Sequence, residues 1–292
     1  MRIMKYFILI LSLFLSVGKN ITSKSAGNKL SDFSGLLNLN IVTGALAIIV
    51  YAFFGISFGG FCEPSFLLLG AFYAIFAVAS TVLNITAMKY GPVAFCTLIY
   101  CAGFIITTAY CAIAFDEPIS VLSGVGMMVL ILSIVAVVYR KNPEKKKTNY
   151  KFLFFSIPAM GCSGALGIVQ KLFAVKYGDG EINSYLFLSF VFVFLISLAI
   201  RLFYKPSDII LMKNSGFIIP GVAYAIIYVV INKLNLYLAG VIDGVVLFPF
   251  LNGGAIALTA IASFIVFKEK LNLRQWIGTA VCIAAIIVVA VG

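Results

Sequence analysis

The chain has 292 residues, of which 63% are hydrophobic and only 11% are charged. An ordinary soluble domain is about 45–50% apolar and about 25% charged, so a water-soluble globular enzyme is excluded. The apolar residues are spread along the whole length, which indicates a membrane protein with many spans rather than a soluble domain with one anchor. The apolar runs are continuous, as in residues 281–291, and this favours helices over the alternating pattern of an outer-membrane barrel.

A helix needs about 20 apolar residues to cross a bilayer. Breaks at charged, glycine and proline clusters divide the chain into ten such segments, so the expected fold class is an all-α integral membrane protein with ten transmembrane helices. The spans are expected near residues 3–21, 36–57, 65–87, 92–114, 118–139, 152–176, 183–204, 215–239, 244–267 and 271–291. The first segment also fits a cleavable signal peptide, because Arg2 and Lys5 precede an apolar run that ends in small residues.

Two stretches of the sequence repeat one another. Residues 70–84 match residues 221–235 at seven of fifteen positions, and an offset of 152 then relates the following two spans of each half. The repeat predicts a first five-helix repeat at 1–139, a basic inter-repeat loop at 140–151 and a second five-helix repeat at 152–292. Because five is odd, the copies are expected to lie in opposite orientations, which is the inverted-repeat plan of secondary transporters.

The net charge of +11 has a topological explanation. Sixteen of the 21 Lys and Arg residues, Lys19 among them, fall on the face of the first inter-span loop, and the positive-inside rule assigns that face to the cytoplasm. Both termini are then expected outside, and no nucleic-acid partner is needed to explain the charge. The chain has no His and no CxxC pair among its six cysteines, so we expect no metal site and no cofactor.

The two halves end in similar sequence patterns. Phe115-Asp116-Glu117 corresponds to Phe267-Lys268-Glu269, and each leads through a short polar stretch into a last helix that bears a glycine, Gly126 or Gly278. Over nearly the whole chain this arrangement resembles the EamA-type family of drug/metabolite transporters. The resemblance implies a carrier of small organic solutes such as amino acids or related metabolites, often exported. It also implies cytoplasmic termini, contrary to the charge count.

The ten acidic residues are all expected in loops or at helix ends, so no carboxylate is expected in mid-membrane to carry a proton. Glu117 and Glu269 are expected to cap the last helix of each half, where the helix dipole favours an anion. A facilitator or exchanger is therefore favoured over a proton-driven pump. A membrane-embedded enzyme is not expected, because no acid–base team is evident.

Lys171 and Lys233 are candidate substrate-binding residues, because a charge at membrane depth is costly and is retained mainly for function. Facing a central cavity, either one could bind an anionic or zwitterionic substrate. The alternative is that each side chain lies along apolar surface and extends its ammonium to the interface. The cavity itself is expected between the halves, lined by the first, third, fourth, sixth, eighth and ninth spans.

Four further candidates for substrate binding are pairs matched across the repeat. Tyr100 and Asn252, at offset 152, fall near mid-span, where they either face the cavity or bond across helix contacts. Tyr73 and Tyr224, at offset 151, either contact a substrate or fill the core.

The expected function is transport of a small-molecule substrate, amino acid-like or organic acid-like, by alternating access across the lipid bilayer of the plasma membrane, with export as the expected direction. The alternative is a flippase subunit for a lipid or a lipid-linked sugar, which a lateral opening between helices would distinguish. The oligomeric state is left open.

Overall fold

The computed structural model describes residues 2–27, 33–57, 59–90, 96, 99–138, 151–204, 215–267 and 273–291. All regular structure in these residues is helical and no strand occurs among them, so the expected all-α fold is confirmed. The α-helices are α1 (Arg2–Gly27), α2 (Phe33–Phe53), α3 (Pro64–Tyr90), α5 (Phe104–Ala114), α6 (Val121–Val138), α7 (Lys151–Tyr177), α8 (Ile182–Tyr204), α9 (Ser215–Val241), α10 (Gly244–Phe267) and α11 (Leu273–Val291). Two short 3₁₀-helices are η1 (Gly59–Cys62) and η2 (Asp179–Glu181).

Six helices are long and apolar enough to cross a membrane, with 19 to 27 residues each. At about 1.5 Å per residue these lengths match a hydrocarbon core of about 30 Å. The six segments are Met4–Ser23, Gly35–Phe53, Pro64–Met88, Lys151–Tyr177, Asp179–Phe203 and Ile219–Val241. The expected fourth, fifth, ninth and tenth spans fall on shorter apolar helices, at Ile99–Ala114, Val121–Ser133, Gly244–Thr259 and Trp276–Val289. The long helices indicate an integral membrane protein.

Large apolar side chains point outward over much of the bundle. Phe203 is 92% exposed, Phe53 is 88% exposed and Ile113 is 81% exposed. In water, extensive apolar surface of this kind favours association or aggregation, whereas the acyl chains of a bilayer cover it without that penalty. The outward faces of the helices therefore suit contact with lipid.

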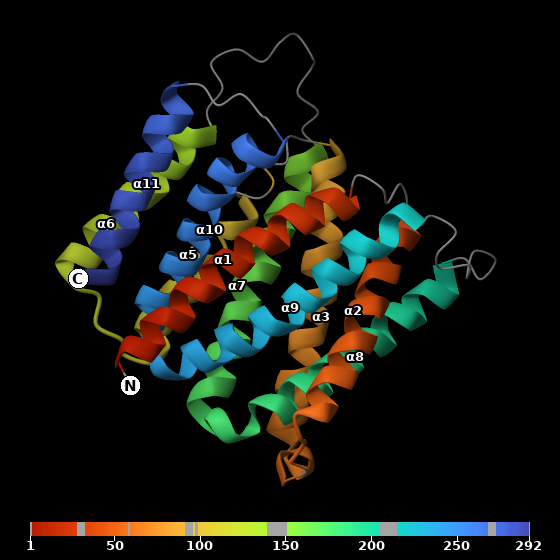
Figure 1. Cartoon of the computed structure of the whole chain (residues 1–292). Coiled ribbons are helices and arrows are strands. Elements are labelled where there is room, and N and C mark those ends of the chain that lie inside the picture. Colours follow the sequence, from red (N-terminus) through yellow and green to blue (C-terminus); the bar gives the residue numbers. More distant parts are fainter. Residues whose placement is uncertain are drawn as a thin grey trace.

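The helices of the first part of the chain pack mainly against helices of the second part. α1 lies along α9 and α3 lies along α7, while α1 also contacts α10 and α5 contacts both α7 and α10. Toward opposite ends of the bundle, α6 pairs with α11 and α2 pairs with α8 (Figure 1). This arrangement leaves α1, α3, α5, α7, α9 and α10 around the centre. Of the expected inter-repeat loop at 140–151, only Lys151 lies within the described residues.

Glycines allow the backbones of α5 and α7 to touch near the centre. A Cβ atom on Gly103 would lie 2.6 Å from the carbonyl oxygen of Met160, and one on Gly164 would lie 2.8 Å from Cβ of Ile106. Thr107 completes the contact, because its hydroxyl donates a hydrogen bond of 2.9 Å to the carbonyl oxygen of Gly164. Small residues with an interhelical hydrogen bond are the usual means of close helix packing in membranes.

Both ends of the described chain lie on the same face of the bundle (Figure 1). Near the start of α1, Nζ of Lys5 donates to the carbonyl oxygen of Val241 at the end of α9, at 3.1 Å. Near the start of α6, the hydroxyl of Ser123 donates to the carbonyl oxygen of Val289 in the last turn of α11, at 3.4 Å. Glu117, just before α6, bonds the first turn of α10, which follows α9 directly. These contacts link the helix ends on one face of the bundle, from the start of α1 to the end of α11.

Candidate functional site

A cavity of about 120 Å³ lies in the centre of the bundle. It is lined by α1, α3, α5 with the turn before it, α7, α9 and α10. These are the helices that the sequence predicts around a central cavity. The polar residues of the lining are Ser16, Lys19, Asn20, Tyr73, Tyr100, Thr107, Ser163, Gln170, Tyr228, Asn232, Asn235 and Asn252. The lining is therefore rich in neutral hydrogen-bonding groups supplied by both parts of the chain.

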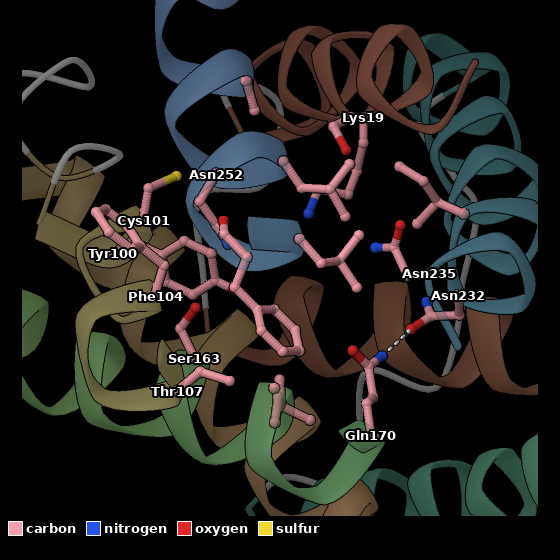
Figure 2. A pocket seen from close by; sticks show the side chains of 18 of the residues that line it. Lys19, Tyr100, Cys101, Phe104, Thr107, Ser163, Gln170, Asn232, Asn235 and Asn252 are labelled. Atoms are coloured by element: carbon pink, nitrogen blue, oxygen red, sulfur yellow. Dashed lines mark hydrogen bonds between the residues drawn. The ribbon is translucent and has the colours of Figure 1, made fainter. Parts of the chain in front are cut away.

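Asn232 of α9 is at the centre of one hydrogen-bond network on the cavity wall. Its Oδ1 accepts a bond from the fully buried hydroxyl of Tyr73 in α3, and a second bond of 3.4 Å from Nε2 of Gln170 in α7 (Figure 2). Its Nδ2 donates to the carbonyl oxygen of Tyr228, at 2.7 Å. Three central helices therefore meet at one amide. Buried amides need such partners, because an unpaired polar group in an apolar interior is costly.

Two further amides join α1 to the second part of the chain. The hydroxyl of Ser12 donates to Oδ1 of Asn235 in α9. Nδ2 of Asn20 donates to the hydroxyl of Thr259 in α10, at 3.1 Å. These bonds fix α1 as one wall of the cavity.

Tyr100 and Asn252 lie on the same side of the cavity, across from Asn232 and Asn235 (Figure 2). Tyr100 precedes α5, and Asn252 lies in α10, with its Nδ2 donating to the carbonyl oxygen of Phe248 at 3.0 Å. Of the six candidate substrate-binding residues, the structure brings Tyr73, Tyr100 and Asn252 together in the lining.

Lys171, Tyr224 and Lys233 are not part of the lining. Tyr224 packs in a separate apolar cluster with residues of α2 and α3, and its ring stacks on Tyr228 with centroids 5.5 Å apart. Lys233 extends away from the cavity, with its Nζ 4.2 Å from the centroid of the Phe54 ring. The Phe54 ring, just after α2, gives this ammonium a cation–π contact.

Lys171 forms a buried ion pair with Glu117, with 2.7 Å between Nζ and Oε1. The other carboxylate oxygen, Oε2, accepts a hydrogen bond of 3.0 Å from the backbone N–H of Val245 in the first turn of α10. The expectation that Glu117 caps the helix that follows it is therefore wrong, because its carboxylate caps α10 and not α6. A local sequence pattern does not reveal this contact, because the partner helix comes from the other part of the chain.

The environment of Glu117 keeps its carboxylate charged. Burial raises the pKa of this group, but hydrogen bonds from Lys171 and from the backbone N–H groups of Gly244 and Val245, together with the positive charge of Lys171, oppose it. The net result is a pKa below the ordinary value of 4.5. The positive end of the α10 dipole favours the same charged state.

Lys19 and four amide side chains of the lining are not among the substrate-binding residues expected from the sequence. The charge count places Lys19 at the cytoplasmic end of the first expected span, 3–21, whereas α1 continues to Gly27 and Lys19 lies on the cavity wall. One signal was available: Ser12, Ser16, Lys19 and Asn20 follow a spacing of four, three and one, which places them on one side of a helix. Tyr228, Asn232 and Asn235 show the same spacing of four and three in α9, whereas Gln170 has no such pattern.

Comparison with known proteins identifies a shared fold. No protein-family model matches the chain, and no protein of curated function matches it. Among solved structures, one described as "Crystal structure of protein" superposes with a TM-score of 0.73 and 14% sequence identity. The match covers 98% of this chain and 96% of that chain. At that identity the likeness concerns the fold alone.

Proposed function

We propose that this protein is a secondary transporter of small metabolites, amino acid-like or organic acid-like, that works by alternating access. One observation carries the proposal: a polar cavity lies at the centre of a bundle whose outer surface is apolar. Transporter binding sites lie near the middle of the membrane, at the interface of structural repeats. A buried cluster of neutral amides and hydroxyls in such a place suits a solute that exchanges hydrogen bonds with water for hydrogen bonds with protein.

The proposal includes ten spans arranged as two inverted five-helix repeats. The packing supports it, because the contact of α1 with α9 has a counterpart in that of α3 with α7, and the contact of α1 with α10 has one in that of α5 with α7. The repeat makes α1 equivalent to α7, α3 to α9 and α5 to α10. Replacing each helix by its equivalent turns each of these contacts into its counterpart. The two ends of the described chain lie on one face, which also agrees with an even number of crossings between them.

The size of the cavity favours a small solute over a lipid. Pockets for drug-sized ligands have volumes of about 300–1,000 Å³, and this cavity of about 120 Å³ is smaller. It is also rich in polar groups, which acyl chains cannot satisfy. Both features support a metabolite carrier rather than a flippase subunit.

Membership of the EamA-type family and residence in the plasma membrane belong to the same proposal. The family assignment is supported by the matched closing stretches of the two halves. Export is the direction that this resemblance implies.

Transport by purified protein in proteoliposomes tests the function. Labelled amino acids, organic acids and amines are supplied in turn to vesicles with wild-type protein, Tyr100→Ala or Asn252→Ala. We expect saturable flux of at least one amino or organic acid, lowered about tenfold by each substitution, since one hydrogen bond to a ligand contributes about 1.4 kcal/mol. Asn84→Ala is the control, because Asn84 lies in α3 outside the lining. Scrambling of a labelled lipid without flux of any water-soluble solute would contradict the proposal.

A further inference from the structure

Lys19 is the only charged residue among the described residues that line the cavity. Its Nζ lies 5.8 Å from the centroid of the Tyr228 ring, at the outer limit of a cation–π contact. In the described part of the chain, the buried ion pair joins Lys171 to Glu117 and the exposed one joins Lys176 to Glu63, so neither supplies a counter-ion for Lys19. A positive charge at membrane depth is costly without a partner. Among the described lining residues, the positive charge of Lys19 is therefore not balanced by a negative one.

The neutral side chains of the lining leave one hydrogen-bond donor and one acceptor for a solute. Because Oδ1 of Asn235 accepts the bond from Ser12, the amide nitrogen of Asn235 remains as a donor. Gln170, across the cavity from Lys19 in Figure 2, uses its Nε2 to bond Asn232, so its Oε1 remains as an acceptor. A solute with an anionic end at Lys19 and a hydroxyl at the far end would match both sides.

The charges of the lining also limit the solute. No Asp or Glu occurs among the described lining residues, so a cationic group on the solute would find no counter-charge there. A single lysine balances a single negative charge, whereas a dianion would leave one charge unpaired. Leu166, Ile231 and Phe248 are among the apolar residues of the lining, which offer surface to a short carbon skeleton.

We propose that the cavity binds a small organic anion with one carboxylate, and that Lys19 forms the ion pair with that carboxylate. The proposal rests on the proposed transport function and names the substrate class of the same site. It assigns the far end of the cavity, at Gln170, to a hydroxyl or another neutral donor on the solute.

Matched solutes that differ in charge test the assignment. Lactate, lactamide, alanine and alaninamide have nearly the same size, and they are respectively anionic, neutral, zwitterionic and cationic. Phenyllactate, phenyllactamide, phenylalanine and phenylalaninamide form the same series with a larger carbon skeleton. Binding is measured as thermal stabilisation of the purified protein, and flux is measured in proteoliposomes. We expect an anion of one series to bind and to be transported at least about tenfold better than its neutral and cationic counterparts, because a charge-assisted bond contributes more than a neutral one.

Variants of Lys19 separate charge from structure. Lys19→Met should lower anion binding about tenfold or more, Lys19→Arg should retain most of it, and Lys233→Met, which removes a lysine outside the lining, should leave it unchanged. Anion binding that survives Lys19→Met, or preference for the neutral, zwitterionic or cationic member, would overturn the anion site while flux still supported a transporter. Absence of flux for every solute, with lipid scrambling, would instead overturn the proposed function itself.

Discussion

Glu117 and Lys171 form an ion pair in which both side chains are more than nine-tenths buried, with 7% of the Lys171 side chain and 8% of the Glu117 side chain exposed. The pair connects α7 to the segment before α6 and to the turn between α9 and α10. Glu117 precedes α6 and bonds the first turn of α10, while Nζ of Lys171 in α7 also donates to the carbonyl oxygen of Ile242, just after α9, at 3.2 Å. The contact therefore joins helices of both parts of the chain on the face that holds the chain ends.

Removing one partner of this pair should destabilise the protein strongly. We expect Glu117→Gln to lower the free energy of unfolding by about 3–5 kcal/mol, because it leaves Lys171 buried without its counter-ion. The double variant Glu117→Gln with Lys171→Met should recover part of the loss. Glu63→Gln is the control: its pair with Lys176 spans 3.9 Å with both side chains about half exposed, and such pairs contribute less than about 1 kcal/mol. Thermal unfolding in detergent measures all four, and equal losses for Glu117→Gln and Glu63→Gln would contradict the expectation.

The same carboxylate should make stability depend on pH in acid. Because the pKa of Glu117 is lower in the folded protein than its ordinary value of 4.5, its stabilising contribution is complete above that value. The contribution is lost progressively as the pH falls below 4.5 and through the folded pKa. Unfolding midpoints measured from neutral pH into this acid range should fall more steeply for wild type than for Glu117→Gln. Parallel curves for the two proteins would rule out Glu117 as a source of the acid sensitivity.

The contact between α5 and α7 should not accept a methyl group at Gly164. A Cβ there would lie 2.8 Å from Cβ of Ile106 and 2.9 Å from the carbonyl oxygen of Gly103, so the two backbones must separate. We expect Gly164→Ala to destabilise the protein by about 1–3 kcal/mol, as overpacking usually does. Gly161→Ala, one turn earlier on α7, meets nothing within 4 Å and should be neutral or slightly stabilising. Thermal melts compare the two, and the reverse order would refute the packing argument.

Tyr73 and Tyr224 occupy matched positions in the two halves but have different surroundings. Tyr73→Phe removes the hydroxyl that bonds Asn232 on the cavity wall, and Tyr224→Phe removes one outside the lining. We expect Tyr73→Phe to lower the rate of solute flux about tenfold, since a bond of about 1–1.5 kcal/mol positions the central amide, and Tyr224→Phe to leave it near wild type. Initial rates in proteoliposomes decide between them. Similar losses in both variants would remove Tyr73 from the transport site.

The sequence predicted the helical fold and the position of the cavity better than the individual site residues. Long apolar runs indicate the spans, and the expectation of a cavity between two halves named the six helices around it. The internal repeat pointed to Tyr73, Tyr100 and Asn252, which line the cavity, and equally to Tyr224, which does not. Lys19 was not expected in the cavity because it lies near the end of the first expected span, 3–21, where the positive-inside rule already explains a lysine. Lys171 was predicted to bind substrate from its position within a span, and that position does not reveal that Glu117 neutralises its charge. Such pairings depend on contacts between distant segments, which one sequence does not display.

If the protein is a transporter as proposed, the position of Lys19 has a consequence for its transport cycle. Alternating access requires a moment when the cavity is closed to both sides. In an empty carrier that moment would seal the Lys19 ammonium from water without a counter-ion, at a cost of several kcal/mol, whereas a bound carboxylate would neutralise it. A transporter of the proposed kind would return faster with a second anion than without one. Exchange of one anion for another would then be faster than net transport.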